Sequence, residues 1–104
     1  MAKQAIFVIV PGGKAETVIQ AAESAGSSGG TIIHARGRGE VASSFLAIEV
    51  EPEREIVMIV AEEAEIAKIS KAIYREMDLN IRGQGLLFVL PLARVEGLAS
   101  LSAD

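Results

Sequence analysis

The segment "HARGRGE", residues 34–40, carries the side chains best suited to hold a small ligand. Arg36 and Arg38 alternate with Gly37 and Gly39 directly after an apolar run. Glycine lets the backbone turn tightly and approach another group closely, and a guanidinium can hold a phosphate or carboxylate through paired hydrogen bonds. A hairpin tip whose charges point into water has the same composition, so the segment alone leaves both interpretations open.

A second glycine-bounded turn, Gly83-Gln84-Gly85, precedes the apolar run at 86–90. A tight turn that leads into a strand requires glycine for its backbone conformation. Consecutive N–H groups in such a turn can also form an anion-binding concavity that needs no side-chain charge. The two roles are compatible, and we interpret the neighbouring Arg82 as a side chain that reaches solvent at the rim.

Four glutamates, Glu49, Glu51, Glu53 and Glu55, occupy alternate positions around Pro52. In an extended chain this period places all four carboxylates on one side, and the proline restricts the segment to a sheet edge or a bulge. We interpret the pattern as a solvated edge that like charges keep soluble. A cation site and a partner-docking surface are the alternatives.

The sequence offers little material for metal or acid–base chemistry. It contains no cysteine, and His34 is its single histidine, which is a poor ligand set for zinc. No nucleophile stands beside a base, so acid–base catalysis would depend on exposed glutamates without evident means of tuning them. We therefore expect no enzymatic activity, and we interpret His34 as an ordinary strand residue.

Composition narrows the class of protein further. The net charge of −4, with one tyrosine, three phenylalanines and no tryptophan, argues against a nucleic-acid-binding face. The N-terminal apolar run, residues 5–10, is too short to be a signal-peptide core or a transmembrane helix. The lack of cysteine suits the cytoplasm. We expect a cytoplasmic protein, not embedded in a membrane, with a single domain over residues 1–104.

Hydrophobic periodicity predicts six elements that would position these residues. Strands are expected at 5–10, 31–35, 55–60 and 86–90, and helices at 14–25 and 62–77. This βαββαβ order predicts a ferredoxin-like α+β fold, a four-stranded antiparallel sheet with two helices on one face. The first and third strands, apolar on both faces, should be central. Because the helices cover only one face, the other needs a second cover, and self-association would supply it.

Four segments resemble, in order and spacing, the PII nitrogen-regulatory signal-transduction family. They are "GGTIIHARGRG", "EPEREIVMIV", "AEIAKISKAIYREM" and "GQGLLFVLPLARVEGL", and the resemblance covers about residues 3–98. It implies a homotrimer whose sheets line a central barrel, with a small effector, usually an adenine nucleotide, between neighbouring subunits. It also implies that the loop after the second strand, the T-loop, here about 37–54, docks on a membrane transporter, an enzyme or a regulator. The tail, about 93–104, consists mainly of small residues and is somewhat polar.

The resemblance implies a set of ligand-binding residues at the matching positions. They are Thr31, Arg36, Gly37, Arg38, Gly39, Gly83, Gln84 and Gly85. Thr31 matches a position that helps to hold the adenine, and Gly37 and Gly39 match the glycines at the start of the T-loop. Gly83-Gln84-Gly85 matches the turn on the phosphate side. From the residues themselves we expect no metal site.

The chain also departs from the family pattern, chiefly by losing positive charge. Leu86 and Glu40 stand where the family has a lysine and an arginine, and Val57 stands where it commonly has a glutamate. No basic C-terminal segment follows, and the only tyrosine, Tyr74, lies on the second predicted helix. Less positive charge favours a less charged ligand than magnesium-ATP, such as ADP, AMP, a cyclic nucleotide or a carboxylated metabolite. A divalent-cation-binding tolerance-type trimer and a ligand-free structural adaptor of the same fold are the alternatives.

Overall fold

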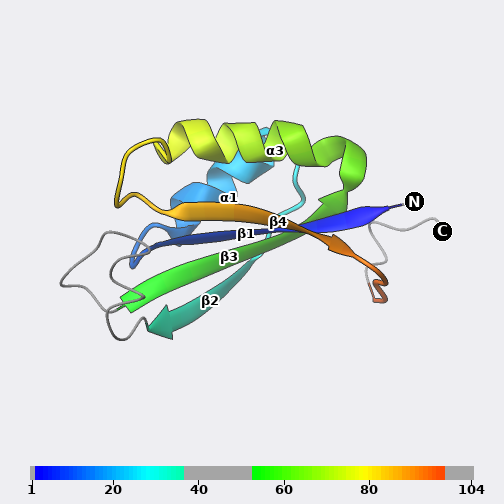
Figure 1. Ribbon diagram of the computed structural model, residues 1–104, viewed down its shortest axis with the longest axis horizontal. Helices are drawn as coiled ribbons and strands as arrows, with labels where there is room; N and C mark the ends of the chain where they lie inside the picture. Colours follow the sequence, from blue (N-terminus) through cyan, green and yellow to red (C-terminus); the bar gives the residue numbers. More distant parts are fainter. Residues whose placement is uncertain (1, 37–52, 98–104) are drawn as a thin grey trace.

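The computed structural model describes residues 2–36 and 53–97. Its elements are β1 (Lys3–Pro11), α1 (Ala15–Ser24), β2 (Thr31–Arg36), β3 (Glu53–Glu62), α3 (Glu63–Glu76) and β4 (Leu86–Leu92). The four strands form one sheet in the order β2-β3-β1-β4 (Figure 1), and every neighbouring pair is antiparallel. The predicted ferredoxin-like fold, with the first and third strands central, is confirmed.

The strands extend beyond their predicted ends. β3 begins at Glu53, two residues before the predicted start of the strand, and Glu53 and Arg54 already pair with β2. β4 continues through Pro91, opposite Gln4 of β1. A proline fits there because β4 is an edge strand, where a backbone nitrogen that faces away from the sheet needs no partner.

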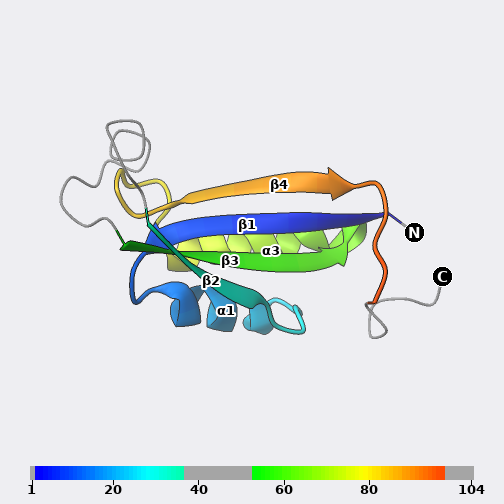
Figure 2. The same ribbon diagram turned by 90° about the horizontal axis from the view of Figure 1, so that it is seen from below.

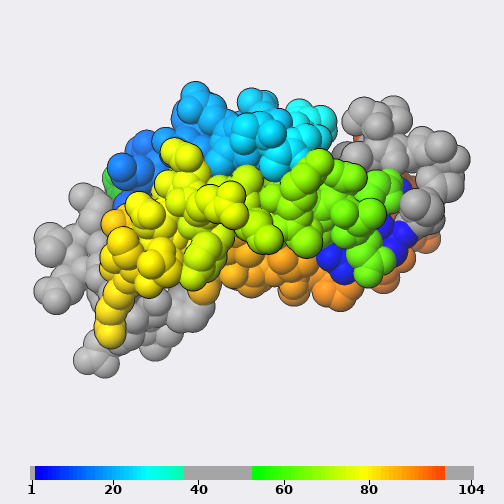
Figure 3. Space-filling view, turned by 90° about the horizontal axis from the view of Figure 1, so that it is seen from above, coloured from blue at the N-terminus to red at the C-terminus, as the bar shows by residue number. Residues whose placement is uncertain are grey.

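The core lies between the sheet and the two helices, which Figure 3 shows side by side over one face. Alternate strand residues point toward the helices, so Ile6, Val8 and Val57 are fully buried. At the second helix, the apolar residues spaced three or four apart are all buried: Ile66, Ile69, Ile73 and Met77. Neither helix in the described ranges is long and apolar enough to cross a membrane.

Helix α1 ends as its sequence predicts. Gly26 takes a φ of +105°, a conformation that glycine adopts without strain. Its N–H donates to the carbonyl of Glu23, and the N–H of Ser27 donates to the carbonyl of Ala22. These two bonds satisfy carbonyl groups that the last turn of a helix leaves free.

The other face of the sheet, which we call the open face, is apolar and has no helix over it in the described residues (Figure 2). Phe7 and Phe88 stack on adjacent strands, with ring centroids 5.4 Å apart. Ile33, Phe88 and Leu90 are 40, 38 and 44% exposed. Met58 also lies on this face, because it pairs with Phe7 in the register. The chain thus leaves one apolar surface uncovered.

Candidate functional site

A hollow of about 560 Å³ lies where β2 ends and β3 begins, next to the turn between β1 and α1. The residues that line it are Gly12, Gly13, His34, Ala35, Arg36, Glu53, Arg54 and Glu55. The register brings them together, because Arg36 pairs with Glu53 and His34 pairs with Glu55. The hollow therefore combines both signs of charge with exposed backbone, at the end of the sheet from which residues 37–52 extend.

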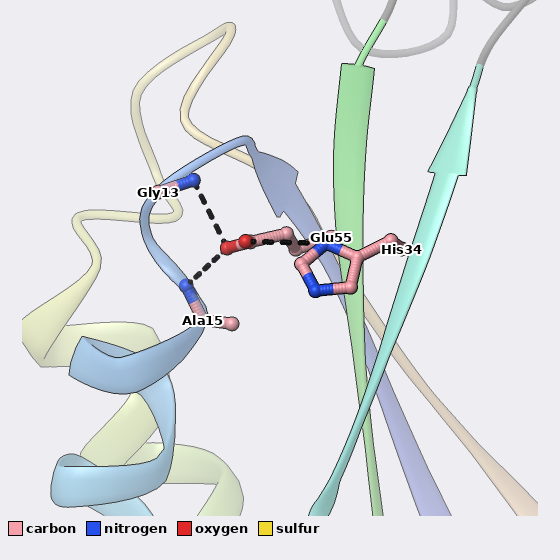
Figure 4. Close-up of polar contacts among 4 residues, drawn as sticks. All are labelled: Gly13, Ala15, His34 and Glu55. Atoms are coloured by element: carbon pink, nitrogen blue, oxygen red, sulfur yellow. Dashed lines mark hydrogen bonds and ion pairs between the residues drawn. The ribbon is translucent and has the colours of Figure 1, made fainter.

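Glu55 holds the start of α1 in place. One carboxylate oxygen accepts hydrogen bonds from the N–H groups of Gly13, at 3.0 Å, and Ala15, at 2.9 Å. The other oxygen lies 3.6 Å from Nδ1 of His34; Figure 4 shows these contacts. Lys14, the residue that precedes the helix, makes no capping bond with its side chain. A carboxylate from a strand therefore satisfies the helix N-terminus and complements its dipole.

This finding corrects the interpretation of the glutamates as one solvated edge. The side chain of Glu55 is only 15% exposed, because it packs against the helix start. Glu53 does remain exposed, and Glu49 and Glu51 lie outside the described residues. Within residues 2–36 and 53–97, no three His, Asp or Glu side chains are grouped as metal ligands.

Arg36 is the last residue of β2, and its guanidinium contacts the carboxylate of Glu53 at 3.2 Å. Both side chains are more than half exposed, and such surface pairs contribute little to stability. An anion that binds here could therefore replace Glu53 as the partner of Arg36 at a small cost in stability. Gly37, Arg38 and Gly39 were predicted in the same site, and they lie outside the described residues.

Arg54 was not among the predicted site residues. It is 5% exposed, the only polar or charged residue that is buried in the described ranges. Its Nη1 donates to the carbonyl of Glu53 at 2.8 Å, and its Nε has no partner there. The sequence held one signal: alternation places Arg54 on the same face as Ile56 and Met58, at the end of an otherwise apolar row.

The turn Gly83-Gln84-Gly85 has the geometry that glycine permits. Gly83 has a φ of +91° and Gly85 a φ of +147°. A Cβ added to Gly85 would lie 2.8 Å from the carbonyl oxygen of Ile9, closer than real Cβ contacts. The N–H of Gln84 donates within the turn, to the carbonyl of Ile81 at 3.2 Å. The positive φ angles and the close packing at Gly85 account for the glycines of this turn, and anion binding there stays a prediction.

Thr31 lies apart from that turn within one chain. It begins β2, one edge of the sheet, whereas Gly83 to Gly85 lead into β4, the other edge. Strands β3 and β1 separate them. Arg36 and the turn share one end of the sheet, because Ile33, Ile56, Ile9 and Leu86 form a continuous row across it. One subunit thus brings together only part of the predicted ligand set.

The family model of nitrogen regulatory protein P-II matches residues 3–100. The chain belongs to this family. Membership confirms the resemblance found in the sequence, and P-II family proteins are signal proteins with a regulatory role. No curated protein sequence matches the chain.

Solved structures of P-II proteins share the fold at low identity. A Bacillus subtilis GlnK–ATP complex is 16% identical, with a TM-score of 0.68, over 97% of this chain and 91% of that one. CPII from Thiomonas intermedia, bound to ADP, AMP and acetate, is 15% identical, with a TM-score of 0.69, over 96% and 94%. Arabidopsis thaliana PII, bound to citrate, is 19% identical, with a TM-score of 0.71, over 96% and 83%.

Proposed function

We propose that this P-II family chain forms a homotrimer that binds an adenine nucleotide in the clefts between neighbouring subunits. The observation that carries the proposal is the separation of Thr31 from Gly83 and Gly85 at opposite edges of one sheet. A ligand can contact both positions only where the β2 edge of one copy approaches the β4 edge of another. Residues 1–104 would then act as one domain within each subunit.

The open face supports the assembly. Ile33, Phe88 and Leu90 are each more than a third exposed. Full burial of a side chain of this size is worth about 1.5–3 kcal/mol, and covering the part that is still exposed would add a fraction of that for each residue. Copies of the same face are the simplest cover for such a surface, and symmetric homo-oligomers are the usual result.

The ligand class follows from the relatives and from the charges of this chain. The Bacillus and Thiomonas structures contain ATP or ADP and AMP, so an adenine nucleotide suits the family. Leu86 and Glu40 remove positive charge from the expected phosphate side. We infer a preference for ADP, AMP or a cyclic nucleotide over magnesium-ATP.

Calorimetric titration tests the ligand, and sedimentation tests the assembly. ATP, ADP, AMP and cyclic AMP are each titrated with and without magnesium, and at least one should bind with about one site per subunit. ADP or AMP should bind more tightly than magnesium-ATP. No heat from any of the four, or a single subunit at working concentrations, would contradict the proposal.

The regulated partner is a cytoplasmic enzyme or the cytoplasmic side of a membrane transporter, contacted through the segment between β2 and β3. Regulation requires that the nucleotide bind one conformation of that segment better than another. Affinity capture from cell extract, with and without the best nucleotide, should retain a partner in a nucleotide-dependent way. Equal capture under both conditions would argue against nucleotide control.

A further inference from the structure

Arg54 carries a buried positive charge that lacks a counterion in the part of the chain that the structure describes. The ion pairs found there join other residues. Within the same ranges, the one hydrogen bond of the Arg54 guanidinium goes to the neutral carbonyl of Glu53. A guanidinium has five N–H donors. Burying it without an anion costs free energy, because the charge loses water and gains no opposite charge.

The other cations at this end of the sheet differ from Arg54. Arg36 already contacts Glu53 and is mostly exposed, and Arg82 is exposed. The carboxylate of Glu55 is taken up by the start of α1 and by His34. Both acidic side chains of the hollow thus have partners, and Arg54 is the cation that would gain most from an added anion.

The position of Arg54 fits a role in the proposed nucleotide site. It lies opposite Pro11 of β1 and Ala35 of β2, one residue beyond the row in which Glu55 pairs with Val10 and His34. The turn at Gly83 to Gly85 lies at the same end of the sheet, two strands away, which is roughly 10 Å at the usual strand spacing. An extended arginine and the turn could contact the same anionic group across that interval.

We propose that Arg54 binds the terminal phosphate of the nucleotide and so supplies positive charge that Leu86 and Glu40 have removed. The inference rests on the proposed function for the identity of the ligand. Arginine suits this role because its planar donors match two phosphate oxygens at once. A buried charge that has no counterion among the described residues fits such a site, because binding sites are often kept at a cost in stability.

The test compares Arg54→Met, Arg54→Lys and the control Arg75→Met, which removes the same charge from an exposed position on α3. Calorimetry measures the affinity of each variant for ADP and for adenosine. Arg54→Met should weaken the binding of ADP about tenfold or more, which is the range of a charged hydrogen bond. Its affinity for adenosine should stay within about twofold of the wild-type value. Arg54→Lys should lie between, since it keeps the charge and loses the paired geometry. Arg75→Met should match the wild type.

Thermal unfolding of the same variants gives a second measurement, with pyrophosphate as the probe. Without ligand, Arg54→Met should be at least as stable as the wild type, because an apolar side chain replaces an uncompensated charge. Pyrophosphate should raise the Tm of the wild type and of Arg75→Met, and should not raise that of Arg54→Met. Equal shifts in all three would overturn the role of Arg54.

The outcomes separate this inference from the proposed function. If the wild type binds ADP and Arg54→Met binds it equally well, the inference fails and nucleotide binding stands. If no nucleotide binds but pyrophosphate protects only the proteins that keep Arg54, the anion site stands and the proposed function fails. If neither ligand has any effect on the wild type, both fail.

Discussion

The two faces of the sheet belong to the same strands. They differ in how completely a single chain buries their apolar side chains and provides partners for their charged groups. On the helix side, apolar residues such as Val8 and Ile73 are fully buried, and even the carboxylate of Glu55 has partners. On the open face, Phe88 remains partly exposed and Arg54 is buried without a counterion in the described ranges. The helix side accounts for folding of the subunit, and the open face points to what the subunit binds.

The strongest test of this contrast places a charge on the open face. Phe88→Glu should dissociate the assembly, because a carboxylate in an apolar interface without a partner costs about 3–5 kcal/mol. Analytical ultracentrifugation would then show single subunits at concentrations where the wild type is a trimer. Circular dichroism checks that the subunit stays folded.

Tyr74→Glu is the matched control for that variant. Tyr74 is also an exposed aromatic residue, on α3 at the helix side, and the same charge there should leave the assembly intact. If Phe88→Glu remained a trimer, the open face would not be the interface. If Tyr74→Glu dissociated it, the interface would lie over the helices.

Truncating a core residue should affect the subunit and not its association. Ile73 of α3 is 0% exposed, so Ile73→Ala should lower the free energy of unfolding by about 2–5 kcal/mol. Ile81, which is 49% exposed, provides the control, and Ile81→Ala should change it by less than about 0.5 kcal/mol. Urea denaturation measures both, and similar losses would mean that the helix side is not the main source of stability.

A comparison of Gly85, in the turn before β4, with Gly13 separates the cost of a steric contact from the cost of a positive φ. Gly85→Ala should cost about 1–3 kcal/mol, because its new Cβ would lie 2.8 Å from the carbonyl oxygen of Ile9. Gly13 also has a positive φ, with nothing within 4 Å of an added Cβ, so Gly13→Ala should cost only about 1 kcal/mol. Equal losses of stability in thermal unfolding would show that the backbone near Ile9 moves away from the added Cβ at little cost.

These contrasts also explain what could be predicted from the sequence. The strands and helices were predictable because their periods are local: Ile66, Ile69 and Ile73 form a stripe whatever they pack against. The central places of β1 and β3 followed from runs that are apolar at every position. The ends of the strands were less predictable, because pairing partners determine whether Glu53 or Pro91 still belongs to a strand.

The roles of the charged residues could not be predicted in the same way. Glu55 looks like one member of an exposed series, yet its partners, Gly13 and Ala15, precede it by about forty residues. Arg54 looks like a surface charge between two glutamates, yet it is only 5% exposed. Such roles arise from contacts between distant parts of the chain, which local patterns do not contain.

Glu55 and Glu53 therefore give the finest comparison, since the two are of one type and two positions apart. Glu55→Ala should lower the free energy of unfolding by about 0.5–2 kcal/mol, the usual effect of losing a helix N-cap. Glu53→Ala should lower it by at most about 0.5 kcal/mol, because it removes only an exposed pair with Arg36. Urea denaturation resolves the difference, and Glu55→Gln, which keeps an oxygen acceptor for Gly13 and Ala15, should recover most of the loss. Were Glu53→Ala the more destabilising variant, the glutamates would act through their charge at the exposed end of β3, and the bonds from Glu55 to the start of α1 would contribute little.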